Sequence, residues 1–312
     1  MKIDSFSQDS PGRVLVTGAN GFLGRYVARS FADQGHTVSG IGHGGWSKDE
    51  WEPWGLSQWN SADVTLETLR QHAERPDVIV HCAGGGSVSF SIEDPIADFE
   101  RTVVTTAHVL EYLRTSAPSC RVVYPSSASV YGTVDTVPIA EDFPTAPISQ
   151  YGTHKLMAEQ MVTSYARQFG THASIVRLFS VYGCGLRKQL LWDACIKFAK
   201  QDGVFMGTGE EVRDWLHVQD ASTLLLAASR HASPQCPTIN GGSGRGATVR
   251  EVLMRLGRNF DVEPGFSGTQ RQGDPSRFIA DIKGAKAWGW HPTKKWTQGV
   301  EEYAAWWKRN SL

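Results

Sequence analysis

The sequence has little of what marks a partner of nucleic acids or membranes. Its 31 Lys and Arg residues balance 32 Asp and Glu residues, so the formal net charge is only −1. That balance gives no electrostatic case for nucleic acid or a membrane surface. No apolar stretch reaches the length that crosses a bilayer, and the N-terminal residues are too polar for a signal peptide. We therefore expect a cytoplasmic protein whose partner is a small molecule.

Cysteine is sparse and scattered. The thiols belong to Cys82, Cys120, Cys184, Cys195 and Cys236. No two of them are spaced like a metal site, so the pattern predicts reduced thiols. His217 and His291 also lack partners at ligand spacing, and we expect both to be structural. The sequence therefore predicts no metal site.

Apolar runs alternate with helical patterns along a chain of 312 residues. Strands are expected at 14–16, 37–41, 56–59, 77–82, 121–124 and 174–178, and helices at 98–114 and 151–170. Strands separated by helices pair in parallel, and their carboxyl ends line one ligand crevice. The pattern predicts a doubly wound parallel Rossmann sheet over residues 11–180, with returning segments near 206–240. Residues 181–205 and 241–312 are expected to form a smaller C-terminal α/β lobe.

The stretch Thr17-Gly18-Ala19-Asn20-Gly21-Phe22-Leu23-Gly24 follows the first apolar run and opens a helical pattern. Its glycines therefore fall where a strand turns into a helix. Glycine permits positive φ and close backbone approach, and a helix N-terminus adds positive charge. The stretch predicts a site for a dinucleotide pyrophosphate; the alternative is an ordinary glycine-rich turn.

An acidic residue is missing just after the second expected strand, where Gly42 and His43 stand instead. An acid there would hydrogen-bond the 2′-hydroxyl of NAD and repel the 2′-phosphate of NADP. Its absence allows NADP, with His43 and Lys48 as possible cationic partners, and does not exclude NAD.

Residues 46–59 hold four tryptophans, Trp46, Trp51, Trp54 and Trp59. Tryptophans are more often packing residues than ligand contacts, so packing is favoured over covering an adenine or forming an oligomer contact.

Tyr151 and Lys155 are four residues apart in an expected helix, hence on one face and one turn apart. A nearby ammonium favours the phenolate and lowers the pKa of a tyrosine, which can then act as a base. Such a pair on its own is more commonly a solvated helix face. Here it follows a nucleotide turn and the serine-rich stretch 126–129, in the order that a hydroxyl dehydrogenase needs.

Several stretches together resemble the extended short-chain dehydrogenases/reductases of the NAD(P)-dependent nucleotide-sugar epimerase/dehydratase family. They are TGANGFLG, HCAG at 81–84, SSASVYG at 126–132, YGTHK at 151–155, RLFSVYG at 177–183, GTGEEVRDWLHVQD at 207–220 and RQGD at 271–274. The resemblance covers nearly the whole chain.

The resemblance implies roles for individual residues. Tyr151 would be the catalytic base, Lys155 would lower its pKa and hold the nicotinamide ribose, and Ser127 would hydrogen-bond the reacting hydroxyl. Together with Tyr151 and Lys155, the cofactor would contact Gly18, Asn20, Gly21, Phe22, Leu23, Gly24, His43, Asp63, Val64, Cys82, Ala83, Gly84 and Ser126. The nucleotide-diphosphate sugar would contact Ser87, Ser127, Ser180, Arg187, Arg213 and Arg271.

Alternatives remain for the arginines. Arg213 and Arg271 would clamp the substrate diphosphate through bidentate guanidinium groups, or form surface salt bridges with Asp214 and Asp274. Arg187, beside Lys188, would contact phosphate or start a solvated helix.

The chain also departs from the family pattern. Thr102 stands where the family commonly has an asparagine that braces the catalytic helix, and Ser180 stands where many members have a substrate-contacting asparagine. Sugar dehydratases have an Asp-Glu pair after the catalytic hydroxyl, where this chain has Ala128 and Ser129. Elimination of water needs that extra acid and base, so dehydration is not expected. The stretch 87–95 resembles the loop after the fourth strand in 4-epimerases.

The leading hypothesis is a nucleotide-sugar 4-epimerase that acts by reversible hydride transfer at C4. The alternative is an NADPH-dependent 4-keto-sugar reductase that uses the same residues once, and a third possibility is a non-catalytic nucleotide-binding sensor. The resemblance also implies a homodimer through the helices at 98–114 and 149–169.

Overall fold

The computed structural model describes residues 12–134, 136–269 and 277–311. Within it the chain forms two compact units. The first comprises Met1–Ser126, His154–Val176 and Leu225–Thr238, and the second comprises Ser127–Thr153, Arg177–Leu224 and Ile239–Leu312.

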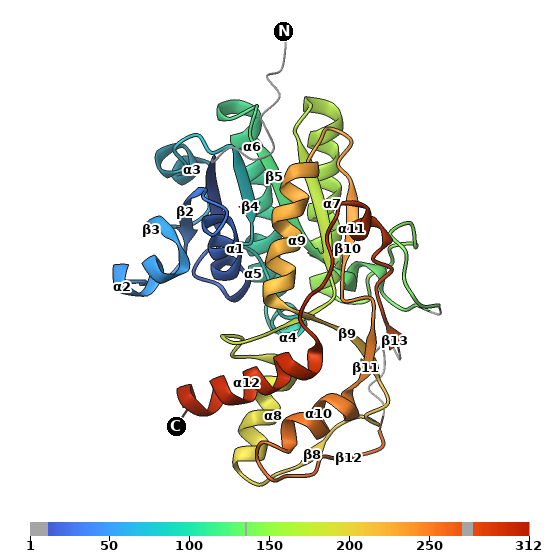
Figure 1. Cartoon of the computed structure of the whole chain (residues 1–312). Helices are drawn as coiled ribbons and strands as arrows, with labels where there is room; N and C mark the ends of the chain where they lie inside the picture. Colours follow the sequence, from blue (N-terminus) through green and yellow to red (C-terminus); the bar gives the residue numbers. More distant parts are fainter. Residues whose placement is uncertain (1–11, 135, 270–276, 312) are drawn as a thin grey trace. The chain divides into compact units, whose positions relative to one another are not determined.

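A seven-stranded sheet has the strand order β10-β6-β5-β4-β1-β2-β3 (Figure 1). Its strands are β1 (Arg13–Thr17), β2 (Thr37–Gly42), β3 (Leu56–Ser61), β4 (Val78–His81), β5 (Arg121–Ser127), β6 (Ala173–Leu178) and β10 (Thr238–Gly241). The neighbours β1–β2, β1–β4, β2–β3 and β4–β5 run parallel. The strand order reverses between β1 and β4, which is where doubly wound sheets bind ligands. The predicted fold class is confirmed.

In the first unit, the side chains on one face of the sheet pack against helices. The helices are α1 (Phe22–Ala32), α3 (Leu66–His72), α6 (Thr105–Ser116) and α7 (Gln150–Phe169). Leu15 and Ile79 on the strands join one buried cluster with Leu69, Leu110 and Val162 from α3, α6 and α7. Successive strand residues point to opposite faces, and α1 packs against β1 and β2.

The helix expected at 98–114 begins three residues earlier, at Pro95. It consists of α5 (Pro95–Phe99), a π-helical turn η2 (Glu100–Val104) and α6, and it follows the short helix α4 (Val88–Glu93). Asp94 accounts for the earlier start, because its Oδ1 accepts a hydrogen bond from the Ala97 N–H at 3.0 Å and caps the first turn.

The second unit is built on a small sheet and three helices. In the sheet, β9 (Val212–His217) pairs with β7 (Ser180–Tyr182), β11 (Gly246–Thr248) and β13 (Arg277–Phe278). The helices α8 (Gln189–Ala199), α10 (Val249–Gly257) and α12 (Trp296–Ser311) pack on one another. Phe198, Phe260 and Trp307 stack between them with ring centroids 5.9 and 5.6 Å apart.

The remaining elements complete the two units. They are α2 (Lys48–Trp51), η1 (Glu52–Trp54), η3 (Ala128–Tyr131), β8 (Val204–Phe205), α9 (Val218–His231), β12 (Gly265–Phe266) and α11 (Lys283–Ala287).

A buried carboxylate fixes the loop at 242–244 to the sheet of the second unit. The Asp214 carboxylate accepts hydrogen bonds from the backbone N–H groups of Ser243, Gly244 and Ala280 at 2.6–3.1 Å. Burial raises the pKa of Asp214, and these hydrogen bonds hold part of that rise back.

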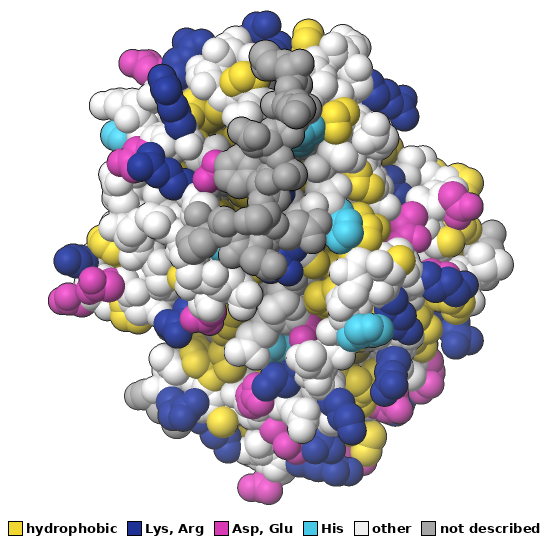
Figure 2. Space-filling view, turned by 45° about the horizontal axis from the view of Figure 1, so that its top comes forward, with side chains coloured by type: hydrophobic (Ala, Val, Ile, Leu, Met, Phe, Trp, Pro, Cys, Tyr) yellow, Lys and Arg dark blue, Asp and Glu magenta, His cyan; other side chains and the backbone are white. Residues whose placement is uncertain are grey.

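Side chains of both charges mix over the face drawn in Figure 2, in keeping with the near-zero net charge. Among the described residues no helix is long and apolar enough to cross a membrane.

The turn between β1 and α1 has no room for added side chains. A Cβ on Gly24 would lie 2.2 Å from the Gly18 carbonyl oxygen and 2.8 Å from Ala19 Cα. These are backbone atoms, which cannot move aside as the end of a flexible side chain can. Glycine at position 24 is therefore required for the helix to pass close to the turn.

We expect Gly24→Ala to lower the free energy of unfolding by about 1–3 kcal/mol, because the added methyl group forces the turn to shift. Urea denaturation followed by circular dichroism measures the loss. Gly265→Ala is the matched control, since a Cβ there meets nothing within 4 Å. Equal stability of the two variants would contradict the close packing of the turn.

Candidate active site

The glycine turn lies at the carboxyl end of β1. Gly18 has a φ of +67°, and its N–H donates to the Ile41 carbonyl at 2.7 Å. A Cβ on Gly18 would lie 2.8 Å from the Ala83 nitrogen, so the turn packs directly on the backbone that follows β4. Gly21 is the N-cap of α1, and in this part of the described chain no side chain caps the helix or places an acid in its first turn. Such an N-terminus suits a phosphate, so these residues fit a dinucleotide.

Most of the predicted cofactor residues come from the same edge of the first unit. Asn20 lies in the glycine turn, Phe22 and Leu23 begin α1, Val64 follows β3, Cys82, Ala83 and Gly84 follow β4, and Ser126 lies in β5. These residues follow the carboxyl ends of strands on both sides of the point where the strand order reverses.

His81, the last residue of β4, ties three elements together. Its Nδ1 lies 2.7 Å from Thr17 Oγ1, and its Nε2 lies 3.1 Å from Thr106 Oγ1. Because the Thr106 hydroxyl donates to the Thr102 carbonyl, Nε2 must carry the proton and Nδ1 must accept from Thr17. Burial, helped by the charge of Lys155, lowers the pKa of His81 to about 3. The ring is therefore neutral, and it joins β1, β4 and α6 with a defined tautomer.

The end of β2 explains why no acid follows it. A Cβ on Gly42 would lie 3.2 Å from the Trp59 ring and 3.3 Å from Gly18 Cα, so a larger residue would push against the glycine turn. The next residue, His43, has its Nδ1 3.0 Å from Asp63 Oδ1, and both side chains are largely exposed. Two of the predicted cofactor contacts, His43 and Asp63, are thus neighbours.

Two of the four tryptophans pack on an arginine beside the glycine turn. The guanidinium of Arg25 lies 5.5 Å from the Trp46 ring centroid and 5.4 Å from that of Trp54. Arg25 also donates to the Asn20 carbonyl at 2.6 Å. These tryptophans therefore pack against the residue that holds the turn.

Lys155 is buried in the first unit, with 7% of its surface exposed. Its Nζ donates to the Pro125 carbonyl at 3.1 Å and lies 5.1 Å from the centroid of the Tyr124 ring. Burial lowers the pKa of Lys155 to about 8, although Cys82, Asp98 and Glu159 act in the opposite direction. With this pKa, Lys155 changes its charge close to neutral pH, as groups at functional sites often do.

Ser127 and Tyr151 belong to the second unit. Ser127 Oγ accepts from the Ser129 N–H at 3.2 Å and the Ser129 hydroxyl at 3.0 Å, so its own proton is left to donate elsewhere. Tyr151 is half-buried in the first turn of α7. The next residue, Gly152, presses on this serine segment, because a Cβ there would lie 2.7 Å from the Ser129 carbonyl oxygen. Tyr151 and Lys155 are one turn apart in one continuous helix, as predicted.

The predicted substrate residues are more dispersed. Ser87 caps α4, where its Oγ accepts from the Phe90 N–H at 3.3 Å. Ser180 and Arg213 lie on the paired strands β7 and β9. The guanidinium of Arg187 lies over the Trp192 and Trp306 rings, 6.0 and 5.8 Å from their centroids. Arg271 and Asp274 lie outside the described residues.

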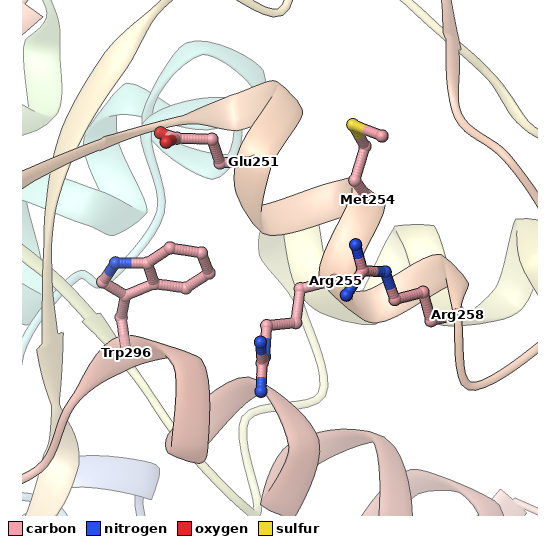
Figure 3. Close-up of a pocket in the computed structure, with 5 residues that line it drawn as sticks. All are labelled: Glu251, Met254, Arg255, Arg258 and Trp296. Carbon is pink, nitrogen blue, oxygen red and sulfur yellow. The ribbon is translucent and has the colours of Figure 1, made fainter.

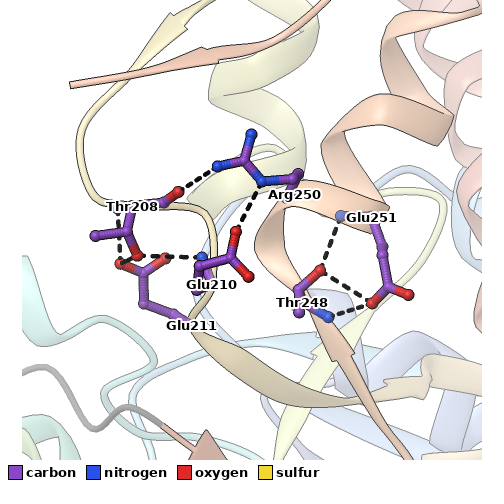
Figure 4. Close-up of polar contacts among 6 residues, drawn as sticks. All are labelled: Thr208, Glu210, Glu211, Thr248, Arg250 and Glu251. Carbon is purple, nitrogen blue, oxygen red and sulfur yellow. Dashed lines mark hydrogen bonds and ion pairs between the residues drawn. The ribbon is translucent and has the colours of Figure 1, made fainter. Parts of the chain in front are cut away.

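Hydrogen bonds fix the loop that precedes β9 (Figure 4). Glu211 Oε1 accepts from the Thr208 N–H at 3.0 Å, and Arg250 bridges the Glu210 carboxylate and the Thr208 carbonyl. The Thr208 contacts lower the pKa of Glu211 against the opposing effect of burial. The loop that leads to Arg213 is therefore held by its own Thr208–Glu211 hydrogen bonds and by Arg250 of α10.

A hollow of about 220 Å³ opens between α10 and the start of α12 (Figure 3). It is lined by Glu251, Met254, Arg255, Arg258 and Trp296. None of these is a predicted site residue. Arg255 is already tied to Glu301 and to the Thr297 carbonyl.

All five cysteines are free thiols. Within the described ranges no group of three His, Cys, Asp or Glu side chains is arranged to hold a metal. The sequence pattern predicts no role for Arg25, His81, Asp98 or His154, although each makes a specific contact in the first unit.

Comparison with known proteins places these features in context. The model of the family "NAD dependent epimerase/dehydratase" matches residues 14–241. A UDP-glucose 4-epimerase of Azospirillum brasilense is 30% identical over 324 residues, covering 96% of this chain and 92% of the relative.

Solved structures agree on the fold. UDP-glucose 4-epimerase of Thermotoga maritima, solved with UDP-glucose, has a TM-score of 0.85 at 24% identity, covering 96% of this chain and 100% of that one. MoeE5, solved with UDP-glucuronic acid and NAD, has a TM-score of 0.84 at 26% identity, with the same coverage. With the glycine turn and the Tyr151–Lys155 helix, these matches show that the chain belongs to the NAD-dependent epimerase/dehydratase family of extended short-chain dehydrogenases/reductases.

Proposed function

We propose that the protein is a nucleotide-diphosphate-sugar 4-epimerase with Tyr151 as its acid and base. The observation that carries this proposal is the buried ammonium of Lys155, one helical turn after Tyr151. A charge removed from water at that position has a direct use in lowering the pKa of the phenol. The relatives named UDP-glucose 4-epimerase support a UDP-hexose as the substrate.

Each of the three residues has a separate part. Tyr151 removes the proton from the sugar 4-hydroxyl and later returns a proton to the C4 oxygen. Ser127 donates a hydrogen bond to that oxygen, which its arrangement with Ser129 permits. Lys155 supplies the positive charge that stabilises the phenolate. When bound, a nicotinamide cofactor would supply reversible hydride chemistry at C4, so the reaction would involve no net oxidation.

We propose that the dinucleotide lies along the edge formed by Gly18–Gly24, His43, Asp63, Val64, Cys82–Gly84 and Ser126. Of NAD and NADP, we propose NAD as the cofactor, and the family description supports it. Asp63, 3.0 Å from His43, adds a negative charge that disfavours a 2′-phosphate. Gly42, with no acid for the 2′-hydroxyl, is the observation that favours the alternative, an NADPH-dependent 4-keto-sugar reductase.

The purified protein should release near-stoichiometric NAD on denaturation, because an epimerase recycles its cofactor in every turnover. Mass spectrometry of the released nucleotide makes the measurement, and added NADPH should not exchange into the untreated protein. An empty protein that takes up NADPH would instead identify the reductase.

We expect Tyr151→Phe to lower the turnover of UDP-glucose and UDP-galactose by at least about 100-fold, because the acid and base is removed. NAD content should stay unchanged, since the phenyl ring keeps the helix packing. Chromatography of the sugar nucleotides and of the released cofactor gives both values. Unchanged sugar conversion in this variant would remove Tyr151 from the mechanism.

The substrate lobe is proposed to comprise residues 181–205 and 241–312. The proposed contacts of the nucleotide-diphosphate sugar are Arg187 and Arg271 in this lobe and Ser87, Ser127, Ser180 and Arg213 outside it. Arg213 and Arg271 would hold the diphosphate by bidentate hydrogen bonds.

We further propose a homodimer formed through the helices at 98–114 and 149–169. Exposed apolar side chains in and near these helices support it, namely Ile92, Ile96, Val104, Met157 and Phe169, which are 36–69% exposed. A monomer would leave this apolar surface in water.

Sedimentation at micromolar concentration should give a dimer of about twice 34.3 kDa. The combined variant Val104→Asp and Met157→Asp should sediment as a monomer, because it places two charges in the interface. Val204→Asp is the control, since Val204 is 61% exposed in the second unit and should leave the dimer intact. A monomeric wild type would refute the proposal.

A further inference from the structure

A buried pair fixes the helix that carries Lys155. His154 Nδ1 lies 2.7 Å from Asp98 Oδ2, and the two side chains are 7% and 0% exposed. The ring of Phe99 packs edge-on against His154 at 5.5 Å. The contact joins α5 to α7, and His154 immediately precedes Lys155. This buried contact between His154 and Asp98 therefore anchors the turn of α7 that carries the Lys155 ammonium.

The other oxygen of Asp98 faces the glycines after β4. Asp98 Oδ1 is buried and makes no hydrogen bond within the described part of the chain. A Cβ on Gly85 would lie 2.0 Å from it, and a Cβ on Gly84 would lie 3.7 Å from Lys155 Nζ. The carboxylate of Asp98 and the ammonium of Lys155 therefore both lie close to the Gly84–Gly85 backbone. Thr102 holds this backbone, because its Oγ1 accepts a hydrogen bond from the Gly85 N–H at 2.9 Å.

The remaining groups near Lys155 leave few charges to balance it. Burial raises the pKa of the Cys82 thiol to about 12, so it is neutral. His81 is neutral as well, and the Tyr124 ring and the Pro125 carbonyl contribute only partial charges. Full negative charges come from the carboxylates of Asp98 on α5 and Glu159 on α7. Tyr151 becomes a third when its phenol ionises.

We propose that Asp98, held in place by His154, is a positioning residue that keeps the side chain of Lys155 in its ammonium form. The proposal rests on the function assigned to Tyr151 and Lys155. A buried ammonium loses its hydration, and a fixed carboxylate nearby compensates for part of that loss. The anchored carboxylate thereby preserves the charge that the phenolate needs.

The direction of the pH effect follows from the groups involved. Lys155 is active as the ammonium, and this form is lost as pH rises through its pKa of about 8. Removing the Asp98 charge lowers this pKa further, so the loss begins at lower pH. A fall of one pH unit would reduce the ammonium fraction at pH 8 from about one half to about one tenth.

The test compares Asp98→Asn with wild type in two measurements. The first is the pH titration of the Lys155 ε-carbon resonance in 13C-lysine-labelled protein, identified by its loss in Lys155→Met. The second is the basic limb of the kcat/KM profile with UDP-glucose. Both midpoints should move to lower pH by at least about half a unit in the variant. An unmoved Lys155 titration in folded Asp98→Asn would overturn the proposal.

Matched variants separate charge from stability. Asp94→Asn removes an exposed carboxylate that caps the same helix, so it should reduce stability and leave both midpoints in place. Asp98→Glu keeps the negative charge and should give a basic limb of the kcat/KM profile like that of the wild type. If Asp98→Asn does not fold, the double variant Asp98→Asn with His154→Gln supplies a neutral hydrogen-bonding pair and carries the same expectation. A Lys155 shift without sugar conversion in wild type would contradict only the proposed function.

Discussion

The constraint on which the first unit depends is the burial of a positive charge. The Lys155 ammonium is shielded from water, and its surroundings are arranged to make that tolerable. The Pro125 carbonyl accepts a hydrogen bond from it, the Tyr124 ring lies nearby, and the Asp98 carboxylate lies close to the same glycine backbone. His81, which could add a positive charge, is neutral. The charged and polar groups around Lys155, which come from β5, α5 and the end of β4, therefore act on one another electrostatically.

Local features of this arrangement could be predicted from the sequence. The glycine turn and α7 were placed within a residue or two, because their signals are short-range: glycine spacing and a 3.6-residue apolar period. The parallel, doubly wound sheet follows from the alternation of strands and helices, since parallel pairing and crossover handedness leave few topologies. Tyr151 and Lys155 could be paired for the same reason, as positions four apart in a helix.

Long-range contacts could not be predicted. Asp98 and His154 are 56 positions apart, and each looks by itself like an ordinary polar helix residue. The tautomer of His81 depends on Thr17 and Thr106, which come from two other elements. The earlier start of α5 at Pro95 has instead a local cause, the Asp94 cap, which apolar periodicity alone does not reveal.

The stacking of Arg25 between Trp46 and Trp54 has an optical consequence. Arg25 also donates to Asn20, so two indoles are linked through one guanidinium to the backbone of the glycine turn. Indole emission is sensitive to the charges and solvent around the ring. The protein thus contains its own fluorophores beside the turn, and their emission offers a label-free way to follow events there.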